Sequence, residues 1–129
     1  MSRFSGPSLP IAILRMLLGI VFILHGAARI YENSFTGFGA FLESKGFPLG
    51  FYLAWAITLF EIGGGIAFFL RWFVTVFCIG EIVILLAGIV LVHWQNGWFV
   101  VGMTEGGIEY SVVLITVLAA IGIAERKSR

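Results

Sequence analysis

Four long apolar runs constrain the fold of this chain more than any other feature. They cover residues 9–31, 51–70, 73–92 and 108–124. Each run is about long enough to cross a hydrocarbon core of roughly 30 Å, because a helix rises about 1.5 Å per residue. We therefore expect an all-α integral membrane protein, a four-helix bundle in which residues 1–129 form a single domain.

The composition agrees with a membrane protein and argues against several other classes. Of the 129 residues, 60% are hydrophobic and only 12% are charged, and the mean hydropathy is +1.05. The formal net charge is only +1 and the basic residues form no stripe with interleaved aromatics, so we expect no nucleic-acid partner. Cys78 is the single cysteine, which excludes an intrachain disulfide and an iron–sulfur cluster held by cysteines of this chain. No spacing resembles a zinc site, a phosphate loop or a serine hydrolase, and we expect no bound metal.

The basic residues predict the orientation of the chain. Most of them fall on one side of the membrane if the helices alternate in direction: Arg3, Arg71, Arg126, Lys127 and Arg129. Basic residues favour the cytoplasmic side. We therefore predict a multi-pass protein of the bacterial cytoplasmic (inner) membrane with both termini in the cytoplasm.

Only Arg71 and Trp72 separate the second and third runs, which predicts a tight antiparallel hairpin of these two helices.

The two outer connections carry structure of their own. In the first, Phe35, Phe38, Phe41 and Leu42 recur at helical spacing, which predicts a short helix in the outer interface. Ser34 is placed to cap the start of this helix and Gly46 to end it. The second connection contains Asn96-Gly97 beside tryptophans suited to the membrane surface, and this predicts a small hairpin-like cap.

Six ionisable side chains lie inside the apolar runs and are the candidate functional residues: Arg15, His25, Arg29, Glu61, Glu81 and Glu109. Placing an ionisable group in lipid costs on the order of several kcal/mol unless the group faces a partner or a wet cavity. At about 100° per residue, Arg15, Gly19, Phe22, Gly26 and Arg29 share one face of the first helix. Glu61 likewise shares a face with the small residues of the second helix, which should contact another helix.

Counting residues from the helix ends predicts which of these groups meet. Arg29 is shallow, His25 roughly 9 Å deep and Glu61 roughly 15 Å deep from the outer side, so His25 and Glu61 should be within reach. Glu109 begins the fourth helix near the depth of Arg29, which predicts an Arg29–Glu109 pair. Pairing of this kind could serve only to fix helix order and register.

A second pair is predicted on the cytoplasmic side. Arg15 and Glu81 lie at roughly 8 and 13 Å, a difference that the long arginine side chain can span. We expect this to be a structural pair.

The outer group has a chemical interpretation as well as a structural one. A carboxylate at the middle of the membrane, next to a histidine, is suited to proton exchange because low-dielectric surroundings disfavour its charged form. His25 and Glu61 are therefore the candidate catalytic residues, and Arg15, Arg29 and Glu109 the candidate ligand-binding residues. A quinone headgroup is the cofactor that such a site could bind and protonate. We expect no haem b, because His25 and His93 are the only axial pair available and their depths differ by several ångströms.

Three stretches of the chain together resemble the DoxX family of small bacterial four-helix membrane proteins. The first stretch runs from Leu14-Arg15 through Gly19 to His25-Gly26 and Arg29. The second is Phe38-Gly-Ala-Phe41-Leu42 followed by Gly46-Phe47-Pro48. The third is Glu61-Ile-Gly63-Gly64. The family usually has lysine at the position of Arg29, and often ends in a Gly-Pro-Gly-like segment where this chain has Gly122-Ile-Ala-Glu-Arg. The resemblance implies a polar core of Arg15, His25, Arg29 and Glu61, with Glu109 contributing. It also implies a role as an oxidoreductase subunit, since related proteins form the membrane part of thiosulfate:quinone oxidoreductase and others associate with enzymes of sulfur or oxidative-stress metabolism.

Three hypotheses of function follow. The first is a membrane subunit of a redox complex, in which His25, Arg29 and Glu61 line an outer-leaflet cavity for a quinone or other small ligand, and electrons come from a membrane or peripheral protein partner. The second is a non-catalytic subunit that assembles or stabilises a larger membrane complex. The third is a small transporter, which with four helices would need a homo-oligomer. In each hypothesis the lipid bilayer is a partner.

Overall fold

The computed structural model describes residues 8–127, and this part of the chain is helical with connecting turns and loops and no strand. Within it, three helices are long and apolar enough to cross a membrane: Leu9–Tyr31, Gly50–Phe69 and Val74–Asn96. They confirm the existence of the first three predicted runs as helices, with the third extended by one turn. Arg3 and Arg129, two of the residues that predicted the orientation, lie outside the described residues.

The described elements, in chain order, are α1 (Leu9–Tyr31), α2 (Phe35–Ser44), α3 (Gly50–Leu59), η1 (Phe60–Gly64), α4 (Gly65–Phe69), α5 (Val74–Gly88), η2 (Ile89–His93), η3 (Trp94–Asn96) and α6 (Glu109–Lys127). The second span is α3, η1 and α4 in succession, and the third is α5, η2 and η3. Both η1 and η2 are single turns of π-helix, which hydrophobic periodicity does not reveal.

The fourth predicted run forms α6, but its crossing of the membrane stays a prediction. The helix has 19 residues, and it is not among the three that combine sufficient length with few charges. Glu125 and Arg126 lie in its last turns, and either Glu109 or Lys127 joins them in any stretch of 18 residues. These charges make α6 less apolar than the other three helices.

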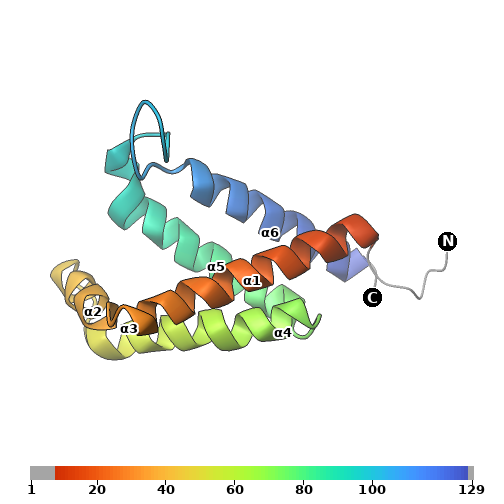
Figure 1. Ribbon diagram of the computed structural model, residues 1–129, viewed down its shortest axis with the longest axis horizontal. Coiled ribbons are helices and arrows are strands. Elements are labelled where there is room, and N and C mark those ends of the chain that lie inside the picture. Colours follow the sequence, from red (N-terminus) through yellow and green to blue (C-terminus); the bar gives the residue numbers. More distant parts are fainter. Residues whose placement is uncertain (1–7, 128–129) are drawn as a thin grey trace. The chain divides into compact units, whose positions relative to one another are not determined.

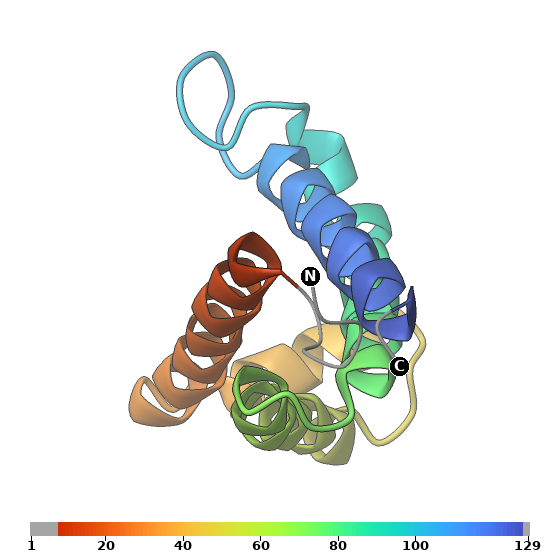
Figure 2. The ribbon, with the colours of Figure 1, turned by 90° about the vertical axis from the view of Figure 1, so that its right-hand side faces the viewer.

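The chain divides into two compact units. Arg15–Phe73 forms the first unit, and the second contains α5 to α6 with the first turns of α1. Figures 1 and 2 show α1 lying along α3 and α4 in the first unit, and α5 lying along α6 in the second. The predicted hairpin between the second and third spans joins the two units, so its packing stays a prediction.

Glycines let α1 approach the second span closely in the first unit. A methyl group on Gly19 would lie 3.0 Å from the carbonyl oxygen of Gly65, and one on Gly26 would lie 3.0 Å from that of Thr58. Small residues at such crossings allow dispersion contacts between backbones, the main source of packing energy between helices in lipid. The faces expected from the sequence are buried here: Gly19, Phe22 and Gly26 on α1, and Ala54, Thr58, Glu61, Gly65 and Phe68 on the second span.

The short helix expected in the first connection forms as α2 and packs on the start of α3, while its place in the outer interface stays a prediction. Gly46, at φ +94°, ends α2 with two hydrogen bonds: its N–H donates to Glu43 O and the N–H of Phe47 donates to Leu42 O. Glu43 Oε2 accepts a hydrogen bond of 3.0 Å from the N–H of Gly50, the first residue of α3. A carboxylate there also complements the positive end of the helix dipole.

One capping prediction is wrong. Ser34 precedes α2, but its side chain makes no capping hydrogen bond to that helix. The Ser34 backbone is already helical, at φ −90° and ψ −1°, and its N–H donates to Arg29 O. The tight turn between α1 and α2 thus directs the hydroxyl back to the same carbonyl, at 3.4 Å.

Replacing Gly39 by alanine should destabilise the packing of α2 on α3 by about 1 to 3 kcal/mol. A methyl group on Gly39 would lie 2.8 Å from Phe51 Cα and 2.9 Å from Phe51 N, and backbone atoms cannot move aside as a flexible side chain can. Gly37 on the same helix is the matched control, because no atom lies within 4 Å of a methyl group there. Gly37→Ala should leave stability unchanged or raise it slightly through helix propensity. Thermal unfolding in detergent distinguishes the two, and equal midpoints would contradict the close approach.

The connection between η3 and α6 is a hydrogen-bonded hairpin-like loop, as the sequence predicts. The N–H groups of Gly106, Gly107, Ile108 and Glu109 donate to carbonyls in Gly97–Val100. Thr104 Oγ1 accepts from Phe99 N at 3.0 Å and lies 2.8 Å from Phe99 O, to which it donates. The loop therefore has a defined conformation with its own internal bonds.

Candidate functional site

Arg29, near the end of α1, is the centre of the polar group in the first unit. Its Nη1 donates to Glu61 Oε1 and to Thr58 Oγ1, each at 2.9 Å. Its guanidinium carbon lies 5.0 Å from the centre of the Phe38 ring, within range of a cation–π interaction. Arg29 thus links three elements, α2, α3 and η1, to α1.

The carboxylate partner of Arg29 is Glu61, which lies in the π turn of η1. The Glu61 side chain is 7% exposed and that of Arg29 is 18% exposed. In the second span Thr58 Oγ1 also donates to Ala54 O at 2.8 Å, so this hydroxyl is fixed while it accepts from Arg29. Single π turns inside helices are frequent at functional sites, and here the turn carries the buried acid.

Arg29 has hydrogen-bond donors that are not used by its bonds to Thr58 and Glu61. A guanidinium carries five N–H groups, and both hydrogen bonds found for it here come from Nη1. Nε and Nη2 donate to no acceptor within residues 8–127. Arg29 also lines a pocket, so these donors are available to an acceptor on a ligand.

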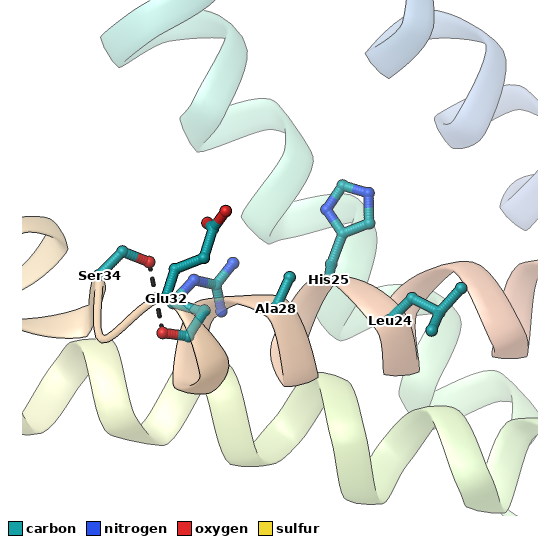
Figure 3. Close-up of a pocket in the computed structure, with 6 residues that line it drawn as sticks. Leu24, His25, Ala28, Glu32 and Ser34 are labelled. Atoms are coloured by element: carbon teal, nitrogen blue, oxygen red, sulfur yellow. Dashed lines mark hydrogen bonds between the residues drawn. The ribbon is translucent and has the colours of Figure 1, made fainter.

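The pocket follows one face at the end of α1 and has a volume of about 330 Å³. It is open to the surroundings and is lined by Leu24, His25, Ala28, Arg29, Glu32 and Ser34. Figure 3 shows these side chains, with the hydroxyl of Ser34 bonded to the backbone of α1. The lining combines the apolar side chains of Leu24 and Ala28 with a histidine, an arginine and a carboxylate. It is chemically suited to a small ligand that offers several hydrogen-bonding groups.

His25 lines this pocket but forms no hydrogen bond with Glu61. Its side chain projects from α1 on the side away from α3 (Figure 3). Glu61, in η1, instead accepts its hydrogen bond from Arg29 of α1. Among the described residues, no hydrogen bond to the ring of His25 is found. No hydrogen bond therefore joins His25 to Glu61 among the described residues, and both roles assigned to them stay predictions.

Arg15 joins α1 to the end of α4, at the other end of the same helix pair. It is 8% exposed, and its Nε donates to Phe68 O at 3.1 Å while Nη2 lies 3.4 Å from Phe69 O. The last carbonyls of a helix have no partner within the helix, so arginine here closes the end of α4. The proposed pair of Arg15 with Glu81 joins the two units and stays a prediction.

The remaining candidates lie in the second unit. Glu109 opens α6, and its Oε1 accepts a hydrogen bond of 3.4 Å from the N–H of Val100, so this carboxylate orders the loop. The Arg29–Glu109 pair joins the two units and stays a prediction, while Arg29 binds Glu61 inside its own unit. His93 Nδ1 lies 2.7 Å from Gly106 O and also holds the loop. Glu81 is fully buried in α5.

Four pocket residues were missed by sequence reasoning: Leu24, Ala28, Glu32 and Ser34. None of them is an ionisable group inside an apolar run or belongs to the buried faces of the helices. Leu24, Ala28 and Glu32 do recur every four residues beside His25 and Arg29, which places Leu24 and Ala28 on one face of α1 and Glu32 in line with them just past its end. That spacing was the available signal for the pocket.

A described chain made of helices, with three able to cross a bilayer and ionisable groups buried between them, is a polytopic helical membrane protein. The chain belongs to the DoxX family, whose model matches residues 11–94. Comparison with curated proteins and with solved structures found no match. The matched region runs from residue 11, in the first turn of α1, past the end of η2, and it includes Arg29, Glu61 and every residue of the pocket.

Proposed function

We propose that this protein is a membrane subunit of a redox complex and that the pocket beside His25 and Arg29 binds a quinone headgroup. The observation that carries the proposal is a half-buried arginine, fixed by Glu61 and Thr58, whose remaining donors border an open pocket. Quinone carbonyls are acceptors, and Arg29 and His25 would hold them. Leu24 and Ala28 supply the apolar wall for the ring.

In this proposal the chain binds and orients the quinone, and a partner supplies the electrons. The only cysteine is Cys78, and no flavin or dinucleotide motif accompanies it in the sequence. Arg29 would stabilise negative charge that develops on a quinone oxygen during reduction. His25 would exchange a proton with that oxygen, because an imidazole ring can both donate and accept a hydrogen bond.

Binding of a short-chain quinone to the protein in lipid nanodiscs tests the proposal. His25→Phe keeps a ring of similar size but removes the hydrogen bond, so the dissociation constant should rise by about 3- to 10-fold. His93→Phe is the matched control, because His93 does not line the pocket, and its affinity should equal that of the unmodified protein. Equal affinities of all three proteins, or no saturable binding, would contradict the proposal.

A subunit that only assembles or stabilises a complex is the second candidate function, and the ion pair favours it. Arg29, Glu61 and Thr58 join α1 to the second span, and Arg15 caps α4, so much of the buried charge already has a structural role. For this function, loss of His25 should change neither complex formation nor stability. Loss of Arg29 should reduce both.

A further inference from the structure

The loop between η3 and α6 has an unusually apolar surface for a connection between two helices. Val101 is 78% exposed and Met103 is 86% exposed, and Trp98 and Phe99 are also exposed. Glu105 is the one charged residue in residues 97–107. Exposed loops are ordinarily polar, and a cluster of large exposed apolar side chains marks an interaction surface.

The conformation of the loop is fixed by the residues around this apolar tip. Four backbone hydrogen bonds join its two halves, and Thr104 bonds to both polar groups of the Phe99 backbone. At its base His93 and Asn96 both bond to Gly106 O, at 2.7 and 3.3 Å. The bonds satisfy backbone groups that would otherwise be costly to bring into an apolar layer.

The apolar surface of the loop continues an exposed apolar face of the third span. Along the third span, large exposed side chains recur at intervals of three or four residues, which is one face of a helix: Val76, Ile79, Val83, Leu86, Val90 and Trp94. A helix with such a face in a bilayer presents it to the acyl chains. Trp94 ends this stripe, and Trp98 begins the loop four residues later.

The length of the third span puts the base of the loop at the membrane surface. Val74–Asn96 has 23 residues and so a length of roughly 34 Å, slightly more than the roughly 30 Å of the hydrocarbon core. Gly97 then turns the chain, at φ +83°. Residues 98–103 start at the depth where tryptophan is enriched and where short apolar segments insert.

We propose that the tip of this loop, residues 98–103, inserts into the interfacial layer of the bilayer, with Val101 and Met103 in contact with lipid. The loop then anchors the end of the third span and the start of α6 at a fixed depth. Glu105 stays on the aqueous side. The occupant of this surface is lipid, and neither a second copy of the chain nor another protein covers it.

Fluorophore labelling of single cysteines tests the proposal in the full chain in nanodiscs. Cys78 is buried and is replaced by alanine, and Met103→Cys and Val101→Cys are each labelled with an environment-sensitive dye. Glu105→Cys is the matched control in the same loop, because it carries the same dye but should remain in water. Quenching is compared between lipids with a nitroxide at the headgroup and a water-soluble nitroxide.

We expect the dyes at positions 101 and 103 to be quenched several-fold more by the lipid nitroxide than by the aqueous one, and the dye at 105 to show the reverse. Strong aqueous quenching at 101 and 103 would overturn the proposal and place the tip in water. Quenching by neither would also overturn it, because protein would then cover the tip. Thr104→Val, which removes the two hydrogen bonds between the Thr104 hydroxyl and the Phe99 backbone, should reduce the lipid quenching at 103 in a protein whose spans remain folded.

Discussion

Replacing Arg29 by leucine should destabilise the first unit by about 3 kcal/mol, because it leaves the Glu61 carboxylate buried without its cation. Glu61→Leu should cost less, about 2 kcal/mol, since the Arg29 side chain is more exposed and can turn toward the open pocket. The double variant, with leucine at both positions, should recover most of the loss. Apolar side chains at both sites leave no unsatisfied charge and pack in a surrounding that is already apolar.

The four proteins form a double-mutant cycle that thermal unfolding in detergent can measure. The expected order of midpoints is the unmodified protein close to the double variant, then Glu61→Leu, then Arg29→Leu. The coupling energy should be about 2 kcal/mol or more. Additive effects of the two single changes would show that the two side chains do not interact, and the assignment of Glu61 as the partner of Arg29 would fail.

The second large effect concerns the closest crossing of α1 with the second span. Gly65→Leu should cost about 3 kcal/mol, because a Cβ atom there would already lie 2.9 Å from Ile23 Cγ1 and 3.1 Å from Gly19 O. The further atoms of leucine extend into the same crossing and would force the helices apart. Since Arg29 and Arg15 both bridge this helix pair, the same change should also weaken their hydrogen bonds.

Gly63 provides the matched control for Gly65. It lies two residues earlier in the same glycine run, is exposed, and has no atom within 4 Å of the place of its Cβ. Gly63→Leu should therefore fold with unchanged or slightly higher stability, because leucine has the better helix propensity. Unfolding midpoints of the two variants in the same detergent provide the comparison. A Gly65 variant as stable as the Gly63 variant would refute the close crossing.

The sequence predicted the three confirmed helices and their buried faces because hydrophobic length and helical period are local properties. Leu9–Tyr31 matches the predicted run at both ends, and Gly46 ends α2 as expected. Small residues at Gly19, Gly26 and Gly65 also identified the contact faces without any knowledge of the neighbouring helix. These features depend on residue type and spacing alone.

The partner of Arg29 could not be predicted in the same way. Counting depth from the ends of the runs assumed that the end of α1 and the start of α3 lie at the same level. In the structure Gly26 lies opposite Thr58, so α3 begins beyond the end of α1. Side chains on a helix also point back toward its N-terminus, and the long Arg29 side chain therefore reaches the level of Thr58 and Glu61.

The direction of His25 depends on the position of the neighbouring helix, which periodicity does not give. A residue 100° from a buried one can face either a partner or a pocket, and His25 lies next to the buried Gly26 but borders the pocket. The π turn around Glu61 is likewise a small deviation that apolar patterning does not encode. The direction of His25 and the π turn around Glu61 affect the geometry of the site more than the arrangement of the helices.

The quinone content of the protein extracted gently from native membranes tests the central claim most directly. The unmodified chain should carry roughly one quinone per chain, while the Arg29→Leu/Glu61→Leu variant, which is expected to fold, should carry almost none because the pocket has lost its fixed donor. Chromatography of the solvent extract quantifies both against the protein concentration. Equal quinone in the two proteins, or none in the unmodified protein, would contradict a quinone site beside Arg29.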